Sequence, residues 1–222
     1  MEKNIYCVFD TETIGIGKKW IYDIGLVIVE KKGKVLHSAQ WLVEEVFNND
    51  NLMNMAYYGE KKETFYSKVN IPIFPFYEVR KQFNQILEEM KVTHITAYNL
   101  GFDARALQDT VKYTNLPGHK FLGKNLQYFD LWEACCRSIF QQKYFQETAL
   151  NNHWLTEKGN FRTSAEIAYR YITGNYNFIE SHTALEDAYI EGEILQKVLK
   201  QKKKITRNSI PAHPWRLCQR KK

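Results

Sequence analysis

The stretch WIYDIGLVIVEKKGKVLHSAQWLV, residues 20–43, contains two apolar runs on either side of a short polar turn. Trp20–Glu30 is rich in residues that favour β-strands, and Lys31–Lys34 contains the glycine typical of a hairpin loop. Val35–Val43 would then complete a hairpin. The preceding run Asn4–Asp10 (NIYCVFD) also favours a strand. We therefore predict that the chain opens with three consecutive strands, of which the last two are antiparallel.

Helices and strands alternate along the rest of the chain. Apolar residues recur at helical spacing over Phe76–Met90, and Val92–Tyr98 is typical of a strand. The other expected elements are a strand at Leu126–Phe129 and helices at Phe102–Thr114, at Leu131–Gln142, at Ser164–Thr173 after a capping box of Thr163 with Glu166, and from Ala184 onward. This order predicts an α/β fold, a mixed five-stranded sheet whose first three strands are antiparallel, with helices on both faces.

The charge distribution separates a mildly acidic body from a basic tail. The chain has 222 residues, among them 31 lysines and arginines and 25 aspartates and glutamates. Ten of the bases and none of the acids lie from Lys197 onward, which leaves 21 bases against 25 acids before it, a balance of −4. The length suits one α/β domain. We predict a domain over residues 1–199 and a basic tail over residues 200–222.

The tail has two alternative roles. It could serve as an electrostatic arm for a polyanion, because phosphate neutralisation is additive and independent of sequence. Lysine-rich tails also often only aid solubility, since runs of like charge are commonly disordered. Trp215, which lies between a proline and an arginine, is a candidate to dock part of the tail on the body.

The sequence argues against a membrane-spanning protein and against a zinc-binding protein. No apolar run approaches the ~20 residues that span a bilayer, so we expect a soluble, cytoplasmic protein without membrane contact. The four cysteines, Cys7, Cys135, Cys136 and Cys218, form no CxxC pair and no zinc-finger spacing with histidines. We expect them to be reduced and without zinc.

Three acidic residues lie where ligands are commonly bound in α/β sheets. If the first strand stays extended to its end, Asp10 and Glu12 share one side of it and Thr11 points to the other. Asp103 falls in the first turn of the helix that follows the strand Val92–Tyr98, a usual ligand position. Each acid also has a plain structural explanation, as a solvated turn residue or as a favourable charge at a helix start.

The segment HTALED, residues 182–187, adds a histidine and a fourth acid. Thr183 and Glu186 match a capping box, which places Thr183 at the N-cap of the last helix. His182 and Asp187 then occupy the two positions that usually bring apolar side chains into contact, so we expect them to be adjacent. A simple structural pair is the alternative. Carboxylates gathered from these segments would suit hard cations such as Mg²⁺ or Mn²⁺.

These segments resemble the three motifs of the DEDDh 3′ to 5′ exonucleases of the ribonuclease H-like superfamily. The matching segments, in chain order, are Phe9-Asp10-Thr11-Glu12-Thr13, Asn99-Leu100-Gly101-Phe102-Asp103 and His182-x-Ala184-x-x-Asp187. The resemblance extends from about Asn4 to Leu199, with the identity concentrated around the motifs. It implies an enzyme that removes nucleotides from the 3′ end of single-stranded DNA or RNA and releases nucleoside 5′-monophosphates.

The resemblance also implies a role for each motif residue. Two Mg²⁺ or Mn²⁺ ions would be held by Asp10, Glu12, Asp103 and Asp187, with His182 as the general base. The implied substrate-binding residues are Thr13 near the terminal 3′ hydroxyl, Phe102 near the terminal base, and Ile14 and Asn99. The partner would be the 3′ end of a single strand, and a homodimer or an association with a polymerase stays open.

Two rival functions and one group of aromatic residues remain to be weighed. A non-catalytic nucleic-acid-binding module would not need the five motif residues, and a structural Ca²⁺ site would be expected to show an Asp-x-Asp-x-Asp-Gly loop, which is not found. The aromatic residues of the irregular stretch 43–75, Tyr57, Tyr58, Phe65 and Tyr66, could stack on unpaired bases. Ordinary burial preferences favour a place in the core.

Overall fold

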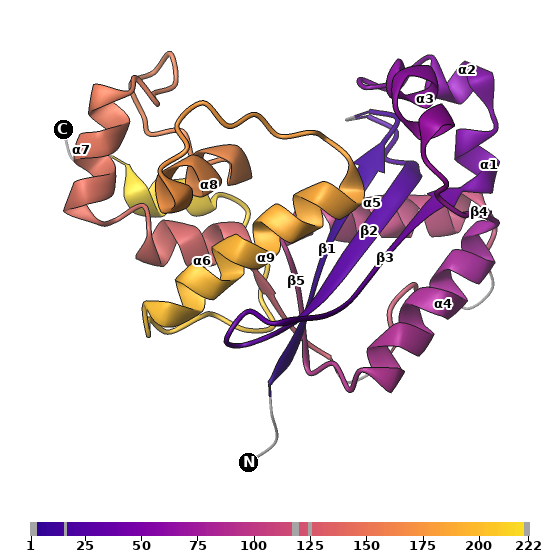
Figure 1. The fold of residues 1–222 in the computed structure, drawn as a ribbon, viewed down its shortest axis with the longest axis horizontal. Coiled ribbons are helices and arrows are strands. Elements are labelled where there is room, and N and C mark those ends of the chain that lie inside the picture. The colour runs from indigo at the N-terminus through magenta and orange to yellow at the C-terminus, as the bar shows by residue number, and fades with distance from the viewer. Residues whose placement is uncertain (1–3, 16, 117–119, 124–125, 220–222) are drawn as a thin grey trace.

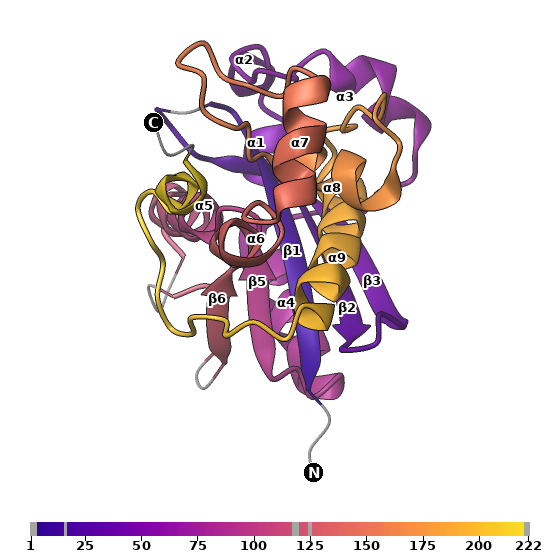
Figure 2. The same cartoon turned by 90° about the vertical axis from the view of Figure 1, so that its left-hand side faces the viewer.

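The computed structural model describes residues 4–15, 17–116, 120–123 and 126–219. A central sheet lies between two helical layers (Figures 1 and 2). Helices α4 (Phe76–Glu89) and α5 (Leu100–Tyr113) cover one face, and α6 (Leu131–Ser138), α8 (Ala165–Thr173) and α9 (Ala184–Lys200) cover the other. The fold class is therefore the predicted α/β arrangement with helices on both faces.

The sheet has six strands rather than the five predicted. In the order β4-β3-β2-β1-β5-β6 these are Ile73–Phe74, Val35–Val43, Ile21–Glu30, Ile5–Thr13, His94–Ala97 and Gln127–Asp130. Strands β1, β2 and β3 are antiparallel as predicted, whereas β5 pairs parallel with β1 and β6 pairs parallel with β5. The additional strand, β4, is parallel to β3. Two residues between prolines are too short a run to show a strand period.

The helices that the sequence did not predict are mostly short. Between β3 and β4 lie α1 (Glu44–Phe47), α2 (Asp50–Met53), α3 (Lys61–Thr64) and the 3₁₀ turn η1 (Tyr66–Lys68). Helix α6 ends at Ser138 instead of continuing to Gln142, and a separate helix α7 (Lys143–Asn151) follows it. A helix of one turn contributes too few residues for an amphipathic period to be read.

The alternation of side chains along β1 divides the core into two parts. Cys7 and Phe9 pack with α4 and α5, whereas Tyr6 and Val8 pack with α6 and α9. Because β1 stays extended to Thr13, the same alternation continues to its end. It directs Asp10 and Glu12 to the face of the sheet that α9 covers, and Thr11 to the face that α5 covers.

The first turn of α9 crosses β2 in direct contact with its backbone. A Cβ atom on Gly25 would lie 2.3 Å from the backbone nitrogen of Leu185 and 2.4 Å from the carbonyl carbon of Ala184. No side chain fits in that space without moving the backbone. Gly25 therefore sets how closely the start of α9 approaches the sheet.

Both predicted capping boxes are corrected by the structure. The N-cap of α8 is Ser164, whose hydroxyl accepts from the backbone N–H of Ile167 at 3.3 Å. Thr163 instead accepts the indole N–H of Trp132 at 2.9 Å. Thr183 is the N-cap of α9 as predicted, but its hydroxyl donates to the carboxylate of Glu186 at 3.1 Å and caps no backbone N–H.

The described part of the tail, residues 201–219, packs on the body. The backbone N–H of Asn208 donates to the carbonyl of Tyr128 on β6 at 2.7 Å. The 3₁₀ turn η2 (Pro214–Cys218) packs against α6 (Figure 2). There Cys218 is buried and Trp215 is half-buried. Residues 220–222 lie outside the described residues. The boundary at residue 199 and the role of the tail as an arm stay predictions.

Among the described helices, none combines the length and the apolar character that a membrane span requires.

Candidate active site

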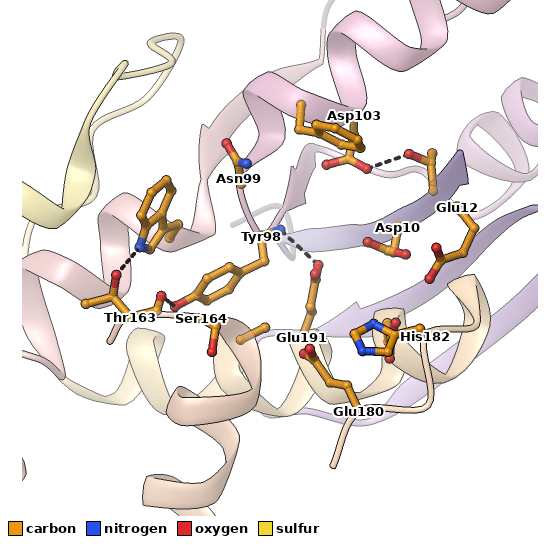
Figure 3. Close-up of a pocket in the computed structure, with 15 residues that line it drawn as sticks. Asp10, Glu12, Tyr98, Asn99, Asp103, Thr163, Ser164, Glu180, His182 and Glu191 are labelled. Atoms are coloured by element: carbon orange, nitrogen blue, oxygen red, sulfur yellow. Dashed lines mark hydrogen bonds between the residues drawn. The ribbon is translucent and has the colours of Figure 1, made fainter. Parts of the chain in front are cut away.

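One cleft brings the motif residues together at the edge where β1 and β5 end and α9 begins. It has a volume of about 450 Å³ and is lined by Asp10, Glu12, Asp103, His182 and Asp187. Figure 3 shows the carboxylate of Asp10 pointing into the space between Asp103 and Glu191, with Glu12 beside it. Residues from positions 10 to 187 of the chain thus share one pocket, as the motifs led us to expect.

Glu12, His182 and Asp187 form the tightest group in the cleft. One ligand atom from each residue lies within 4.8 Å of those of the other two. The Oδ1 atom of Asp187 is buried and has no hydrogen-bond partner among the described residues. A buried acceptor without a donor is costly unless a ligand satisfies it. The two carboxylates of this group therefore suit a divalent cation, and the imidazole of His182 lies beside them.

Repulsion and burial raise the pKa values of the acids in the cleft. Burial, followed by the charge of Asp103, raises the pKa of Asp10 well above its usual value. Burial also raises the pKa of Glu12 to about 8, with a further increase from Asp23, and that of Asp187 to about 8, with a further increase from Glu180. A bound cation reverses this effect, because it favours the charged form of each carboxylate.

Asp103 is held by a residue that the sequence did not assign to the site. The hydroxyl of Thr11 donates to Oδ1 of Asp103 at 2.7 Å (Figure 3). The alternation along β1 places Thr11 on the side away from Asp10 and Glu12, as predicted, and that side faces α5. Burial raises the pKa of Asp103 to about 7, and the bond from Thr11 opposes the increase.

Two further acids line the cleft and were not predicted. Glu191 lies one helical turn after Asp187 on α9, is buried, and accepts the backbone N–H of Tyr98 through Oε2 at 2.9 Å. Glu180 precedes α9 and enters the cleft beside His182 (Figure 3). The spacing of four residues between Asp187 and Glu191 is a sequence signal that would have placed both on one helix face.

A buried acid on β2 holds the start of α9 in place. Asp23 is fully buried, and its Oδ2 accepts the backbone N–H of Ala184 at 3.1 Å and the hydroxyl of Tyr66 at 2.7 Å. Gln40 donates to both of its oxygens at 3.0 and 2.9 Å. A carboxylate at a helix N-terminus is favourable because it satisfies a free N–H and the helix dipole. Asp23 and Gly25 together place the residues at the start of α9 in the cleft.

The segment between β3 and β4 touches the histidine directly. The ring of Tyr58 stacks on His182, with centroids 4.3 Å apart and planes inclined by 15°. The ammonium of Lys61 donates to the carbonyl of His182 at 2.6 Å and to that of Ser181. His182 has a φ of 51°, which is uncommon for a residue with a side chain. These contacts hold the backbone and the ring of His182 in this conformation.

The four aromatic residues of that segment differ in their exposure. Tyr66 is buried, as the core prediction required, while Phe65 and Tyr58 are half-buried. Tyr57 is 81% exposed, so its expected place in the core is wrong. Of these four rings, that of Tyr58 stacks on His182, and none of the four lines the cleft.

The predicted substrate-binding residues fall in two groups. Asn99, in a left-handed conformation at the N-cap of α5, and Phe102 in the first turn of α5 both line the cleft. Ile14 is buried in the core, and the hydroxyl of Thr13 is 3.5 Å from the carbonyl oxygen of Gly15. Neither Thr13 nor Ile14 lines the cleft, and the roles of all four residues stay predictions.

Solved nuclease structures share this architecture. The chain superimposes on Escherichia coli (E. coli) Exonuclease I in complex with a dA16 oligonucleotide with a TM-score of 0.55 and 12% identity, over 90% of this chain and 41% of that chain. For cell-death related nuclease 4 (CRN-4) the TM-score is 0.56 and the identity 16%, over 93% of this chain and 67% of that chain. The fold is ribonuclease H-like.

A third structure agrees with the other two. Exonuclease I from Methylocaldum szegediense shares the ribonuclease H-like fold with a TM-score of 0.54 and 12% identity, over 90% of this chain and 41% of that chain. The chain therefore spans about two fifths of the length of the Exonuclease I chains. No family model and no curated protein matches the sequence.

Proposed function

We propose that this protein is a divalent-metal-dependent 3′ to 5′ exonuclease of the DEDDh type that acts on single-stranded DNA or RNA. The observation that supports the proposal is the single cleft lined by four motif carboxylates and a histidine that come from three distant segments. A fold shared with Exonuclease I and CRN-4 agrees with it. The geometry of the cleft and the three sequence motifs connect the chain to phosphodiester hydrolysis, and the shared fold is consistent with both.

The acids suit two Mg²⁺ or Mn²⁺ ions. Glu12 and Asp187 would hold one ion, Asp103 would complete the site of the other, and Asp10, which points between the two groups, would contact both. Bound divalent ions would supply an activated water and would stabilise the charge on the leaving 3′ oxygen. Oxygen-rich ligand sets of this kind favour hard cations over zinc.

His182 is suited to accept the proton of the attacking water. Burial and the nearby charge of Lys61 lower its pKa, so the imidazole is neutral near neutral pH, and a neutral imidazole has one nitrogen that can accept a proton. Attack on the last phosphodiester forms a bond from the water oxygen to phosphorus and breaks the bond from phosphorus to the 3′ oxygen. The shortened strand then ends in a 3′ hydroxyl, and the released nucleotide keeps its 5′ phosphate.

A cleavage assay tests the reaction and the substrate together. The purified protein is incubated with 5′-labelled single-stranded DNA, single-stranded RNA and duplex, each with Mg²⁺ and with chelator. We expect a ladder of products that differ by one nucleotide and that chelator abolishes. Binding without any cleavage would instead support the alternative, a non-catalytic nucleic-acid-binding module.

Replacement of His182 tests its role as the base. The variant His182→Ala should bind substrate and metal like the wild type but lose about 10²- to 10⁴-fold in kcat, the range for loss of a general base. His37→Ala, a half-buried histidine on β3, is the matched control and should keep full activity. Full activity of His182→Ala would exclude the assignment. A homodimer, a polymerase partner and a cytoplasmic location stay predictions.

A further inference from the structure

A second cavity adjoins the acidic cleft and differs from it in charge. This cavity, the tail groove, has a volume of about 740 Å³ and lies between the segment 156–164, α6 and the turn η2 of the C-terminal tail. Trp132, Thr163 and Ser164 line both cavities, so the two lie side by side. In Figure 3, Thr163 and Ser164 lie on the side of the cleft away from Glu12. A strand that enters the cleft from that side would pass through the tail groove.

Two indole rings from distant parts of the chain face the tail groove. Trp132 on α6 is half-buried, and its N–H donates to the hydroxyl of Thr163 at 2.9 Å, which fixes the orientation of the ring. Trp215 on η2 is also half-buried, and its carbonyl accepts from the Sγ of the buried Cys218 at 3.3 Å. The bond to Thr163 holds the ring of Trp132, so this ring loses little freedom when a planar group stacks on it, whereas the bond from Cys218 holds only the backbone at Trp215.

Positive charge predominates around these rings. Lys158 and Arg162 are exposed at the tail groove, and Glu157 is the one acid among its lining residues. The guanidinium of Arg216 lies 5.7 Å from the centroid of the Trp215 ring. Sites for single-stranded nucleic acid usually combine a positively charged groove, which follows the phosphates, with aromatic side chains on which the nucleobases stack.

We infer that the tail groove binds the unpaired nucleotides directly upstream of the 3′-terminal one, with their bases stacked on Trp132 and Trp215 and their phosphates near Lys158 and Arg162. The inference deepens the proposed function, since the exonuclease reaction at the cleft determines which nucleotides are upstream. It assigns the C-terminal segment to a substrate subsite. The stacking is tolerant of base identity, because every base has an aromatic face.

Substrates of two lengths separate the tail groove from the cleft. The p-nitrophenyl ester of thymidine 5′-phosphate has no upstream nucleotide, whereas an oligonucleotide of about eight residues has several. Trp215→Ala should raise KM for the oligonucleotide roughly 5- to 150-fold, the range for loss of one stacked base, and leave the ester unchanged. Trp215→Phe, which keeps a stacking ring, should restore most of the loss. An unchanged KM for the oligonucleotide in Trp215→Ala would overturn the inference.

Binding in chelator tests the tail groove without any catalysis. The binding of 5′-fluorescein oligonucleotides of DNA and of RNA is measured by fluorescence anisotropy. Trp215→Ala should bind at least one of the two oligonucleotides more weakly than the wild type does. If only one is affected, that result identifies the preferred sugar. The double variant Lys158→Gln with Arg162→Gln should reduce the slope of log affinity against log salt by roughly 1.4, because each phosphate contact to a single strand contributes about 0.7. Equal affinity and slope in all variants would exclude the tail groove as a subsite.

A matched control distinguishes stacking from a general loss of aromatic surface. Tyr77 is 58% exposed on α4, a helix on the opposite face of the sheet, so Tyr77→Ala should change neither KM nor anisotropy. Circular dichroism of each variant verifies the fold. If the wild type cleaves neither substrate, the proposed function fails, while the anisotropy of wild type against Trp215→Ala still decides whether the tail groove binds a strand.

Discussion

The two sides of the acidic cleft are built differently. On one side, Glu12, His182 and Asp187 place their ligand atoms within 4.8 Å of one another, and an oxygen of Asp187 has no partner among the described residues. On the other side, Asp103 and Glu191 each accept a hydrogen bond from the scaffold. The first side is arranged to receive a cation, and the second is already held by the protein. Variants on each side should therefore fail in different ways.

The largest effect is expected where the two sides meet. Asp10 lies between Glu12 of the first side and Glu191 of the second, so Asp10→Ala would remove a ligand from both proposed ions at once. We expect Mg²⁺-supported cleavage to fall by about 10³-fold or more, at least as much as the loss of one charge-stabilising group in other active sites. Single-turnover cleavage measures the loss. Asp109→Ala, on the same helix as Asp103, is the control, and appreciable activity in Asp10→Ala would disprove a shared ligand.

A change at Gly25 should disturb the first side most, because the residues of that side lie nearest to the start of α9. A Cβ there meets the backbone of α9, so Gly25→Ala should push the start of that helix, with His182 and Asp187, away from β1. We expect a loss of about 1–3 kcal/mol in the free energy of unfolding, as for other overpacked sites, together with lower activity. Gly192→Ala, in the same helix, places its Cβ at an ordinary 3.9 Å from Val29 and should not lose stability. Urea unfolding compares the two variants.

The second side should respond to loss of one hydroxyl. Thr11→Val keeps the shape of the side chain but removes the donor to Asp103. We expect a decrease of roughly 10- to 100-fold in metal affinity or activity, which is typical when the hydrogen bond to a metal ligand is lost. Thr11→Ser retains the hydroxyl and should retain most of the function. The cleavage rate is measured against Mg²⁺ concentration for both variants. Equal curves for Thr11→Val and Thr11→Ser would show that the hydrogen bond to Asp103 contributes nothing to metal affinity or activity.

The predictable parts of the site depend on local patterns. The N-cap position of Thr183 and the strand alternation at Asp10 and Glu12 follow from a few neighbouring residues, so the sequence alone placed them correctly. The resemblance to the exonuclease motifs then supplied the proposed roles. Longer amphipathic helices such as α4 were found for the same reason, because fourteen residues show a clear period.

The parts that escaped prediction depend on contacts between distant segments. Asp23 caps α9 across 161 residues, and Thr11 reaches Asp103 across 92. Nothing near Asp23 in the sequence indicates which helix it meets, although an acid inside the apolar run Ile21–Val29 is itself unusual. Lys61 begins the one-turn helix α3 and Tyr58 lies in the turn before it, and their place beside His182 is set by tertiary packing. Such residues become visible only when the chain is folded.

A further expected effect is a dependence of stability on pH that differs between the two sides. The folded pKa values of Glu12 and Asp187 are raised to about 8 and that of Asp103 to about 7, well above those of unfolded chains. Between about pH 4 and pH 8 the folded protein therefore keeps protons that the unfolded chain has lost. In chelator, stability should fall as pH rises through this window and level off above it.

The two sides can be compared by removing one titrating acid at a time. Asp187→Asn should flatten the fall in stability up to about pH 8, whereas Asp103→Asn should flatten it only up to about pH 7, since each variant removes the group with the corresponding pKa. In the wild type, Mg²⁺ should reduce the fall in stability with rising pH. The cation binds only to the folded protein with deprotonated acids, and it offsets the repulsion between their carboxylates. Urea midpoints across this pH range measure all four cases. A wild-type midpoint that rises with pH in chelator would show that these acids are ionised without a cation, and that the scaffold alone stabilises their charge.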